Sequence, residues 1–237
     1  MRQKKATGYG SCVVGYTLTS QSSQSSHTPS VNASQEGGGG AETGPHTAPT
    51  NDTMSETAEA LAANQQSRRN ITIEITNLTN KYCLLDPKVY LDSGNCHSPP
   101  QPTVRPQKTE VCNFTKASAK ASGAVGVLTY DLFEKDSNGA QETLAIMFSV
   151  PYDYNIYKNW IALGIYPQGK ECNEALYKEM YNNKEQNGFK REEATGSGLT
   201  FEGSSLDIKA TMSPMGRAIM KVEVWDKFFS PRQHQHY

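Results

Sequence analysis

The sequence predicts a mainly-β fold, a single β-sandwich flanked by two α-helices, with a disordered N-terminal extension. Three observations support this class. Several short segments alternate apolar and polar residues with a period of two, turn-forming residues separate them, and only two stretches have the composition and spacing of helices. The length of 237 residues suits one domain with an extension. Many short strands with turns between them are typical of a β-sandwich.

The first 53 residues differ in composition from the rest of the chain. Gly, Ser and Thr fill 24 of these 53 positions, whereas Leu, Ile, Val and Phe fill four. Such a segment buries too little apolar surface to offset the entropy lost on ordering it. We therefore expect residues 1–53 to be disordered. One hypothesis is that Met54 is the true initiator and that residues 1–53 are an artefact of the gene model.

A first helix is predicted over residues 54–69. Ser55 is a suitable N-cap, Glu56 and Glu59 lie in the first turns, and the alanines between them and Asn64 favour helix. This helix has a single bulky aliphatic residue, Leu61. Its apolar face is therefore expected to be narrow.

The sandwich is predicted over residues 70–228, followed by a tail over 229–237. Alternating or continuous apolar segments predict strands at 71–76, 89–91, 123–133, 142–150, 157–166, 199–210 and 216–225. Turn residues at 136–139 and at Ser213–Pro214 join the middle and the last pairs of strands into hairpins. The four prolines between 98 and 108 predict a loop, and residues 173–183 have the pattern of a second helix.

Charge and hydropathy exclude several classes of protein. There are 23 Lys and Arg against 24 Asp and Glu, so the chain lacks the basic excess of a general nucleic-acid binder. It has no run of about 18 consecutive apolar residues, which a transmembrane helix needs. The early apolar run Cys12–Val14 is too short for a signal peptide. We expect a soluble protein, either cytosolic or released without a classical signal peptide.

The cysteines do not indicate a metal site. The four cysteines after the extension are 13, 16 and 60 positions apart, and no CxxC pair occurs. In a cytosolic protein they are expected to be free buried thiols, although one or two disulfides remain an alternative. We expect no metal and no cofactor.

Catalytic patterns are also lacking. Four of the five histidines lie in the two tails, and only His97 falls inside the domain. No nucleophile elbow, P-loop, dinucleotide fingerprint or HExxH helix is present. The acidic pair Glu192–Glu193 is interpreted as a solvated pair on a loop. The sequence therefore does not predict an enzyme.

Clustered aromatic residues are the most informative feature. Six of the twelve tyrosines fall between Tyr152 and Tyr181, and Trp160 lies among them. Tyr177 and Tyr181 are four residues apart on the second predicted helix, beside a separate apolar stripe. Tyr and Trp suit the headgroup layer of a membrane and stack on choline or sugars. The alternative is that these side chains pack at the edge of the core.

Long contiguous motifs connect this cluster to a known family. They are GAVGVLTY (123–130), TLAIMFSVPYDYN (143–155), Tyr157, Asn159, Trp160 and LYKEMY (176–181). On these motifs the sequence resembles the actinoporins, the pore-forming cytolysins of sea anemones, from about Arg69 to Phe228. In its Arg68–Arg69 pair and in the expected absence of a signal peptide, the sequence resembles the fish actinoporin-like proteins more than the secreted venom toxins.

The resemblance implies a monomer in solution that binds phosphocholine headgroups, prefers sphingomyelin, forms homo-oligomers on the target membrane and opens a cation-permeable pore with its N-terminal helix. The phosphocholine pocket of the family matches Ser93, Val125, Ser149, Pro151, Tyr177 and Tyr181. Its membrane-docking aromatic residues match Tyr152, Tyr154, Tyr157 and Trp160.

Several positions depart from the family pattern. Ile156 and Ile161 stand where the docking loop has tryptophans, and Asn182 replaces a third pocket tyrosine. Lys184–Gly188 replaces an Arg-Gly-Asp loop. Weaker anchoring and a different headgroup choice are expected. Because a helix over 55–66 spans only about 18 Å of a hydrocarbon layer about 30 Å thick, a lipid-headgroup or glycan-binding (lectin-like) module without a pore is the alternative.

Overall fold

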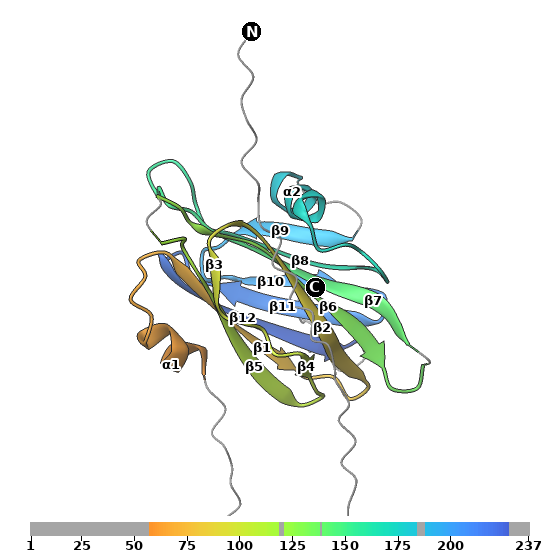
Figure 1. The fold of residues 1–237 in the computed structure, drawn as a ribbon. Coiled ribbons are helices and arrows are strands. Elements are labelled where there is room, and N and C mark those ends of the chain that lie inside the picture. The colour runs from red at the N-terminus through yellow and green to blue at the C-terminus, as the bar shows by residue number, and fades with distance from the viewer. Residues whose placement is uncertain (1–56, 119–120, 138, 184–187, 228–237) are drawn as a thin grey trace, which may run out of the picture. The chain divides into compact units, whose positions relative to one another are not determined.

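The computed structural model describes residues 57–118, 121–137, 139–183 and 188–227. Within these ranges the chain forms two six-stranded sheets that pack face to face, with one short helix beside each (Figure 1). This confirms the predicted mainly-β sandwich with two helices. The predictions for residues 1–53, for Met54 and Ser55 and for the tail 229–237 lie outside the described residues.

The first sheet combines the two ends of the domain. In spatial order it contains β10 (Gly198–Glu202), β11 (Leu206–Met212), β12 (Arg217–Asp226), β1 (Asn70–Asn77), β5 (Lys108–Thr115) and β3 (Asn95–Ser98). The first strand, β1, pairs in parallel with the last, β12, and all other neighbours are antiparallel. The alternation Ile71, Ile73, Ile75 on β1 places three isoleucines in the core, as the sequence predicts.

The second sheet is antiparallel throughout. Its spatial order is β4 (Thr103–Val104), β2 (Tyr82–Ser93), β6 (Ala124–Glu134), β7 (Ala140–Val150), β8 (Trp160–Pro167) and β9 (Phe189–Glu193). The predicted hairpin of β6 and β7 is confirmed. On β7, Phe148 points into the core and stacks on Phe114 of β5 with ring centroids 4.9 Å apart. Met147 lies on the opposite, outer face.

A helix covers that outer face, which explains why β7 is apolar on both sides. This helix, α2 (Glu174–Asn182), is capped by Asn173, whose side chain accepts from the Leu176 backbone N–H. Leu176 and Met180 of α2 are fully buried against the sheet. Burying each is worth about 1.5–3 kcal/mol. The predicted helix 173–183 is confirmed to within one residue at each end.

The other helix, α1 (Ala58–Ala63), is shorter than the predicted helix 54–69. It begins at the N-cap Thr57, whose hydroxyl accepts from the Ala60 N–H, and it ends at Asn64. Residues 64–69 are not helical, which corrects that part of the prediction. The physical reason is that Ala58 and Leu61 are the only residues of α1 that it buries, so no apolar face continues beyond Ala63.

Other differences concern strands that the sequence did not reveal. The proline-rich loop 98–108 contains β4, and β3, β5 and β9 were not predicted. The predicted strand 199–210 is two strands, β10 and β11, separated at a turn where the Gly203 N–H donates to the Leu206 carbonyl. Glu192–Glu193 lies at the end of β9 rather than on a loop.

Candidate functional site

The register of the second sheet aligns three of the predicted pocket residues. Val125 of β6 pairs with Ser93 of β2 on one side and with Ser149 of β7 on the other, and Ser149 pairs with Trp160 of β8. Residues directly opposite one another in antiparallel strands have their side chains on the same face. The outer face of the sheet therefore has a row of two hydroxyls, one valine and one indole.

Pro151 adjoins this row. The Ser93 hydroxyl donates to the Gly123 carbonyl at 3.4 Å. Gly123 in turn lies so close to the end of β7 that an added Cβ would come within 3.1 Å of the Pro151 Cα and 2.2 Å of the Val150 oxygen. Only glycine permits this approach. The structure thus brings Ser93, Val125, Ser149 and Pro151 together at one end of the sheet.

Helix α2 supplies the aromatic wall of the site. The Tyr177 and Tyr181 rings stack with centroids 5.5 Å apart, and the Tyr90 ring of β2 lies 6.1 Å from that of Tyr177. Tyr177, Tyr181, Val125 and Trp160 belong to one apolar cluster under α2. Tyr177 is buried and Tyr181 is half-buried, so core-edge packing accounts for part of their role. Burial, and then the charge of Asp92, raises the pKa of Tyr177 above that of an ordinary phenol.

A cation that sequence reasoning missed lies in this wall. The guanidinium carbon of Arg191, on β9, is 3.7 Å from the centroid of the Trp160 ring and 5.6 Å from that of Tyr181. Its Nε is buried and has no hydrogen-bond partner among the described residues. Because β9 was not predicted, no sequence signal placed Arg191 next to these rings.

The loop between β7 and β8 carries the predicted docking aromatics. Tyr152 and Tyr157 are 52% and 53% exposed, and Ile156 is 70% exposed. Tyr154 is half-buried, since its hydroxyl donates to the Asn159 Oδ1 at 2.7 Å and its ring lies 4.7 Å from the Arg69 guanidinium. Two of the four predicted aromatics, Tyr152 and Tyr157, are thus about half exposed to solvent, whereas Tyr154 and Trp160 are more covered.

Ile161 does not belong to the docking loop, contrary to the sequence-based expectation. It is buried in the core between the sheets on β8. Strand alternation is the reason, because Trp160 and Ala162 occupy the outer face and Ile161 must point inward.

The turn next to this loop carries a further exposed apolar residue, which the sequence analysis did not identify. Met215, between β11 and β12, is 64% exposed. The Asn159 side-chain amide donates to the carbonyls of Ser213 and Met215 at 3.0 and 3.1 Å. Asn159 is itself buried, so these bonds hold the turn against the β7–β8 loop. We call Tyr152, Ile156, Tyr157 and Met215 the apolar rim.

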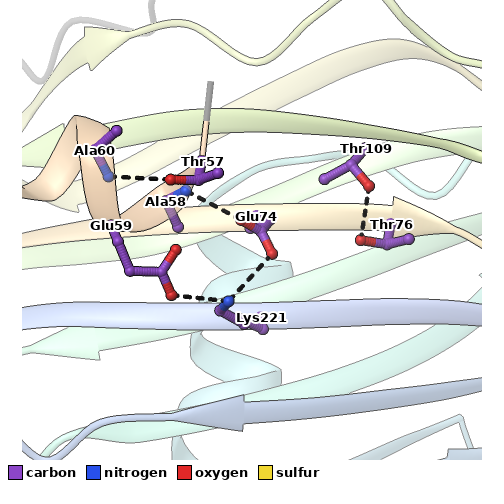
Figure 2. A network of polar contacts seen from close by, with 8 residues as sticks. All are labelled: Thr57, Ala58, Glu59, Ala60, Glu74, Thr76, Thr109 and Lys221. Carbon is purple, nitrogen blue, oxygen red and sulfur yellow. Dashed lines mark hydrogen bonds and ion pairs between the residues drawn. The ribbon is translucent and has the colours of Figure 1, made fainter. Parts of the chain in front are cut away.

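Helix α1 is held on the other sheet by a small polar network and an apolar contact. Glu74 of β1 accepts from the Ala58 N–H at 3.0 Å, and the Lys221 ammonium of β12 lies 2.8 Å from Glu59 and 3.5 Å from Glu74. Figure 2 shows these contacts together. Their hydrogen bond lowers the pKa of Glu59 and raises that of Lys221. Beneath the network, Ala58 and Leu61 pack on apolar residues of β5 and β12.

Comparison with known proteins assigns this arrangement to a family. The family model described as "Sea anemone cytotoxic protein" matches residues 52–226, which includes both sheets, the pocket and the apolar rim. The chain belongs to the sea anemone cytotoxic protein family. The resemblance to the actinoporins is thereby confirmed, and membership of a family of non-enzymatic toxins agrees with the expectation that the chain is not an enzyme. The finer resemblance to fish proteins stays a prediction.

Individual members of the family are similar to this chain over limited lengths. DELTA-alicitoxin-Pse1b of Phyllodiscus semoni is 54% identical over 63 residues, which are 27% of this chain and 25% of the toxin. Deep sea actinoporin Cjtox II of Cribrinopsis japonica is 44% identical over 87 residues, which are 35% of this chain and 36% of that protein. The chain thus spans only about a quarter to a third of the length of these two relatives.

A solved structure with low sequence identity to this chain has a similar fold. The crystal structure of the lipid binding protein Nakanori superposes with a TM-score of 0.56 at 10% identity and covers 71% of this chain and 76% of that one. Among the described residues, no helix has the length and apolar character needed to cross a membrane.

Proposed function

We propose that this protein is a cytolysin that is monomeric in solution, binds phosphocholine headgroups with a preference for sphingomyelin, assembles into homo-oligomers on the membrane and forms a cation-permeable pore. One observation supports this most. The continuous segment Ser149–Trp160 joins the pocket to the apolar rim. A headgroup in the pocket and apolar side chains in the interface can therefore contact the same patch of membrane.

The rim has the chemistry of an interfacial anchor. Its two tyrosines carry an apolar ring and a polar hydroxyl, which suits the headgroup layer, while Ile156 and Met215 are fully apolar. Basic side chains accompany them, because Lys158 and Arg69 belong to or contact the same loop. The rim therefore combines insertion with attraction to phosphate-bearing lipids.

The pocket has groups for both parts of a phosphocholine. The hydroxyls of Ser93 and Ser149 suit phosphate oxygens, and the faces of Tyr90, Tyr177 and Tyr181 suit a quaternary ammonium. Neutral phenols serve this purpose, and tyrosine is neutral at physiological pH; burial raises the pKa of Tyr177 further.

The pore requires more helix than the described residues contain. The six residues of α1 rise about 9 Å, against about 30 Å of hydrocarbon. A spanning helix needs about 20 residues, so α1 alone is too short and must leave the contacts with Glu74 and Lys221 to become part of one. We propose that this release follows docking.

The test uses the full chain with vesicles of sphingomyelin and phosphatidylcholine, of phosphatidylcholine alone, and of lipids without choline. Co-sedimentation measures binding, dye release measures pores, and chemical cross-linking measures assembly on the same samples. Binding, leakage and cross-linked oligomers that are all strongest with sphingomyelin are expected. Absence of binding to every choline-containing vesicle would contradict the proposal.

A headgroup- or glycan-binding module without a pore is the second candidate. It is favoured by the shortness of α1 and its fixed position on the sandwich. The fold of a lipid binding protein, Nakanori, shows that a similar sandwich occurs in a protein described by its lipid binding. Binding without leakage at saturating protein, or inhibition by free sugars, would support this candidate.

A further inference from the structure

Resting on the function proposed above, we propose that Arg191 binds the phosphate group of the ligand, so that the pocket recognises phosphate at least as strongly as choline. A phosphate can arrive as part of a lipid headgroup or as a free ion, and the chemistry of the contact is the same. The position of Arg191, its neighbours and its unused donor each support this assignment.

Arg191 lies on the pocket side of β9. Its Cα pairs with Ala162 of β8, and the same register row continues through Met147 and Val127. These three partners form part of the apolar cluster under α2, so the row faces outward from the sandwich. Arg191 therefore shares a face with Trp160 and with the row that contains the two serines.

The guanidinium is held by aromatic faces rather than by an anion. Its carbon is 3.7 Å from the Trp160 centroid and 5.6 Å from that of Tyr181. Within the described ranges no carboxylate forms an ion pair with Arg191, although Glu193 is two residues away on the same strand and Glu192 pairs with Lys190. Its buried Nε also lacks an acceptor there.

A guanidinium that is stacked on an aromatic ring and has no paired carboxylate is suited to binding an oxyanion. Guanidinium presents its donors in a fork that matches two oxygens of a phosphate, and stacking fixes its plane while leaving the N–H edge available. Burial lowers the pKa of Arg191, because it removes water from the charged form. A bound phosphate supplies both the missing acceptor and the missing negative charge.

The same geometry restricts where an ammonium can bind. Arg191 already covers the Trp160 face, so the tyrosines next to β2 are left for choline. The pocket thus offers a cation at one end and free aromatic faces at the other, which complements a zwitterion. We expect phosphoethanolamine to be tolerated better than choline without phosphate.

The experiment follows Trp160 fluorescence in the full chain carrying Trp225→Phe, because the protein has two tryptophans. O-phosphocholine, inorganic phosphate and choline chloride are titrated, and sphingomyelin vesicles are tested by co-sedimentation. Arg191→Gln is compared with Arg191→Lys and with the control Lys190→Gln, which removes the same charge from the adjacent position of β9. Circular dichroism checks that each variant is folded.

Phosphocholine should bind far better than choline, and Arg191→Gln should weaken its binding and that of vesicles about tenfold or more. Arg191→Lys should lose less, and Lys190→Gln should change affinity no more than about twofold. In the parent chain, inorganic phosphate should displace vesicles at ionic strengths where chloride does not. This last measurement needs no variant at position 191.

Different failures are distinguishable. If Arg191→Gln binds phosphocholine and vesicles as tightly as the parent, or more tightly, Arg191 does not bind phosphate and the proposed function survives. If free phosphate binds through Arg191 but no vesicle does, the assignment of Arg191 stands and the membrane function is wrong. If the parent chain binds choline as well as phosphocholine, the assignment is overturned even though vesicles bind.

Discussion

The attachment of α1 to the sandwich gives the sharpest prediction, because a single carboxylate on β1 accepts a hydrogen bond from the start of the helix. Glu74 accepts a hydrogen bond from the Ala58 N–H, and Ala58 is fully buried. Glu74→Ala leaves that donor without its acceptor, which costs about 1.5–3 kcal/mol. Losing the half-exposed pair with Lys221 adds about 0.2–1 kcal/mol. Together, α1 should become less stable on the sandwich by about 2–4 kcal/mol.

Amide hydrogen exchange measures this directly. The Leu61 N–H is bonded to the Thr57 carbonyl inside α1, and its exchange should accelerate roughly 30- to 1,000-fold in Glu74→Ala. Glu74→Gln keeps an acceptor and should accelerate exchange less than about tenfold. Thr109→Val is the matched control, because the hydroxyl pair of Thr76 and Thr109 lies on the neighbouring strands without touching α1 (Figure 2).

Unchanged Leu61 exchange in Glu74→Ala would refute the reasoning, because it would mean that apolar contacts alone hold the helix. Equal acceleration in Thr109→Val would show general loosening of the sheet. If the pore proposal is right, Glu74→Ala should also shorten the lag before dye release, while the amount of protein bound to vesicles stays the same.

Three further outcomes are expected. Asn159→Ala removes three side-chain hydrogen bonds from a buried site and should lower the free energy of unfolding by about 2–4 kcal/mol in urea titrations. Replacing Ile156 and Met215 together by serine should weaken vesicle binding about tenfold or more without changing affinity for free phosphocholine. Glu59 has a lowered pKa from its bond with Lys221, so its stabilisation of α1 is complete above pH 4.5 and declines as the pH falls below that value; exchange in α1, corrected for intrinsic rates, should accelerate there.

Each of these has a result that would count against it. A urea midpoint unchanged in Asn159→Ala would mean that the turn at Met215 is held by other contacts. Weakened binding of free phosphocholine in the Ile156 and Met215 double variant would place those side chains in the pocket instead of the interface. If α1 exchange is flat below pH 4.5, or equally pH-dependent in Lys221→Met, the ion pair with Glu59 does not stabilise the helix.

The sequence predicted those parts of the fold in which local pattern and tertiary structure agree. Ile71, Ile73 and Ile75 alternate on β1 and lie in the core, and the turn-forming residues at 136–139 predicted the hairpin that the β6–β7 register confirms. Strand β5 was missed because it buries a polar residue: the Asn113 amide donates to the Ile71 carbonyl and the Thr72 hydroxyl. Such a partner on another strand is invisible in a local pattern.

Only some residues of the candidate site could be predicted from the sequence. The resemblance named Ser93, Val125 and Ser149, and the structure places them in one register row, although their role in binding stays a prediction. Arg191 was missed because the charged sequence of an edge strand such as β9 is typical of a loop. Its ring contacts also come from residues of β8 and α2, which are distant in the sequence. Met215 was missed because only the Asn159 bonds reveal that its turn adjoins the β7–β8 loop.

Arg69 gives the docking loop a second connection with its own consequence. Its Nε donates to the Tyr152 carbonyl at 3.0 Å, and Arg69 is also the residue at which the chain passes from the α1 segment into β1. The N-terminal segment therefore leaves the sandwich at the loop proposed to sit on the membrane. If α1 is released as proposed, it would swing about a pivot at that loop, with the five residues between Ala63 and Arg69 as its tether. Shortening that tether should hinder insertion while leaving the docked state intact.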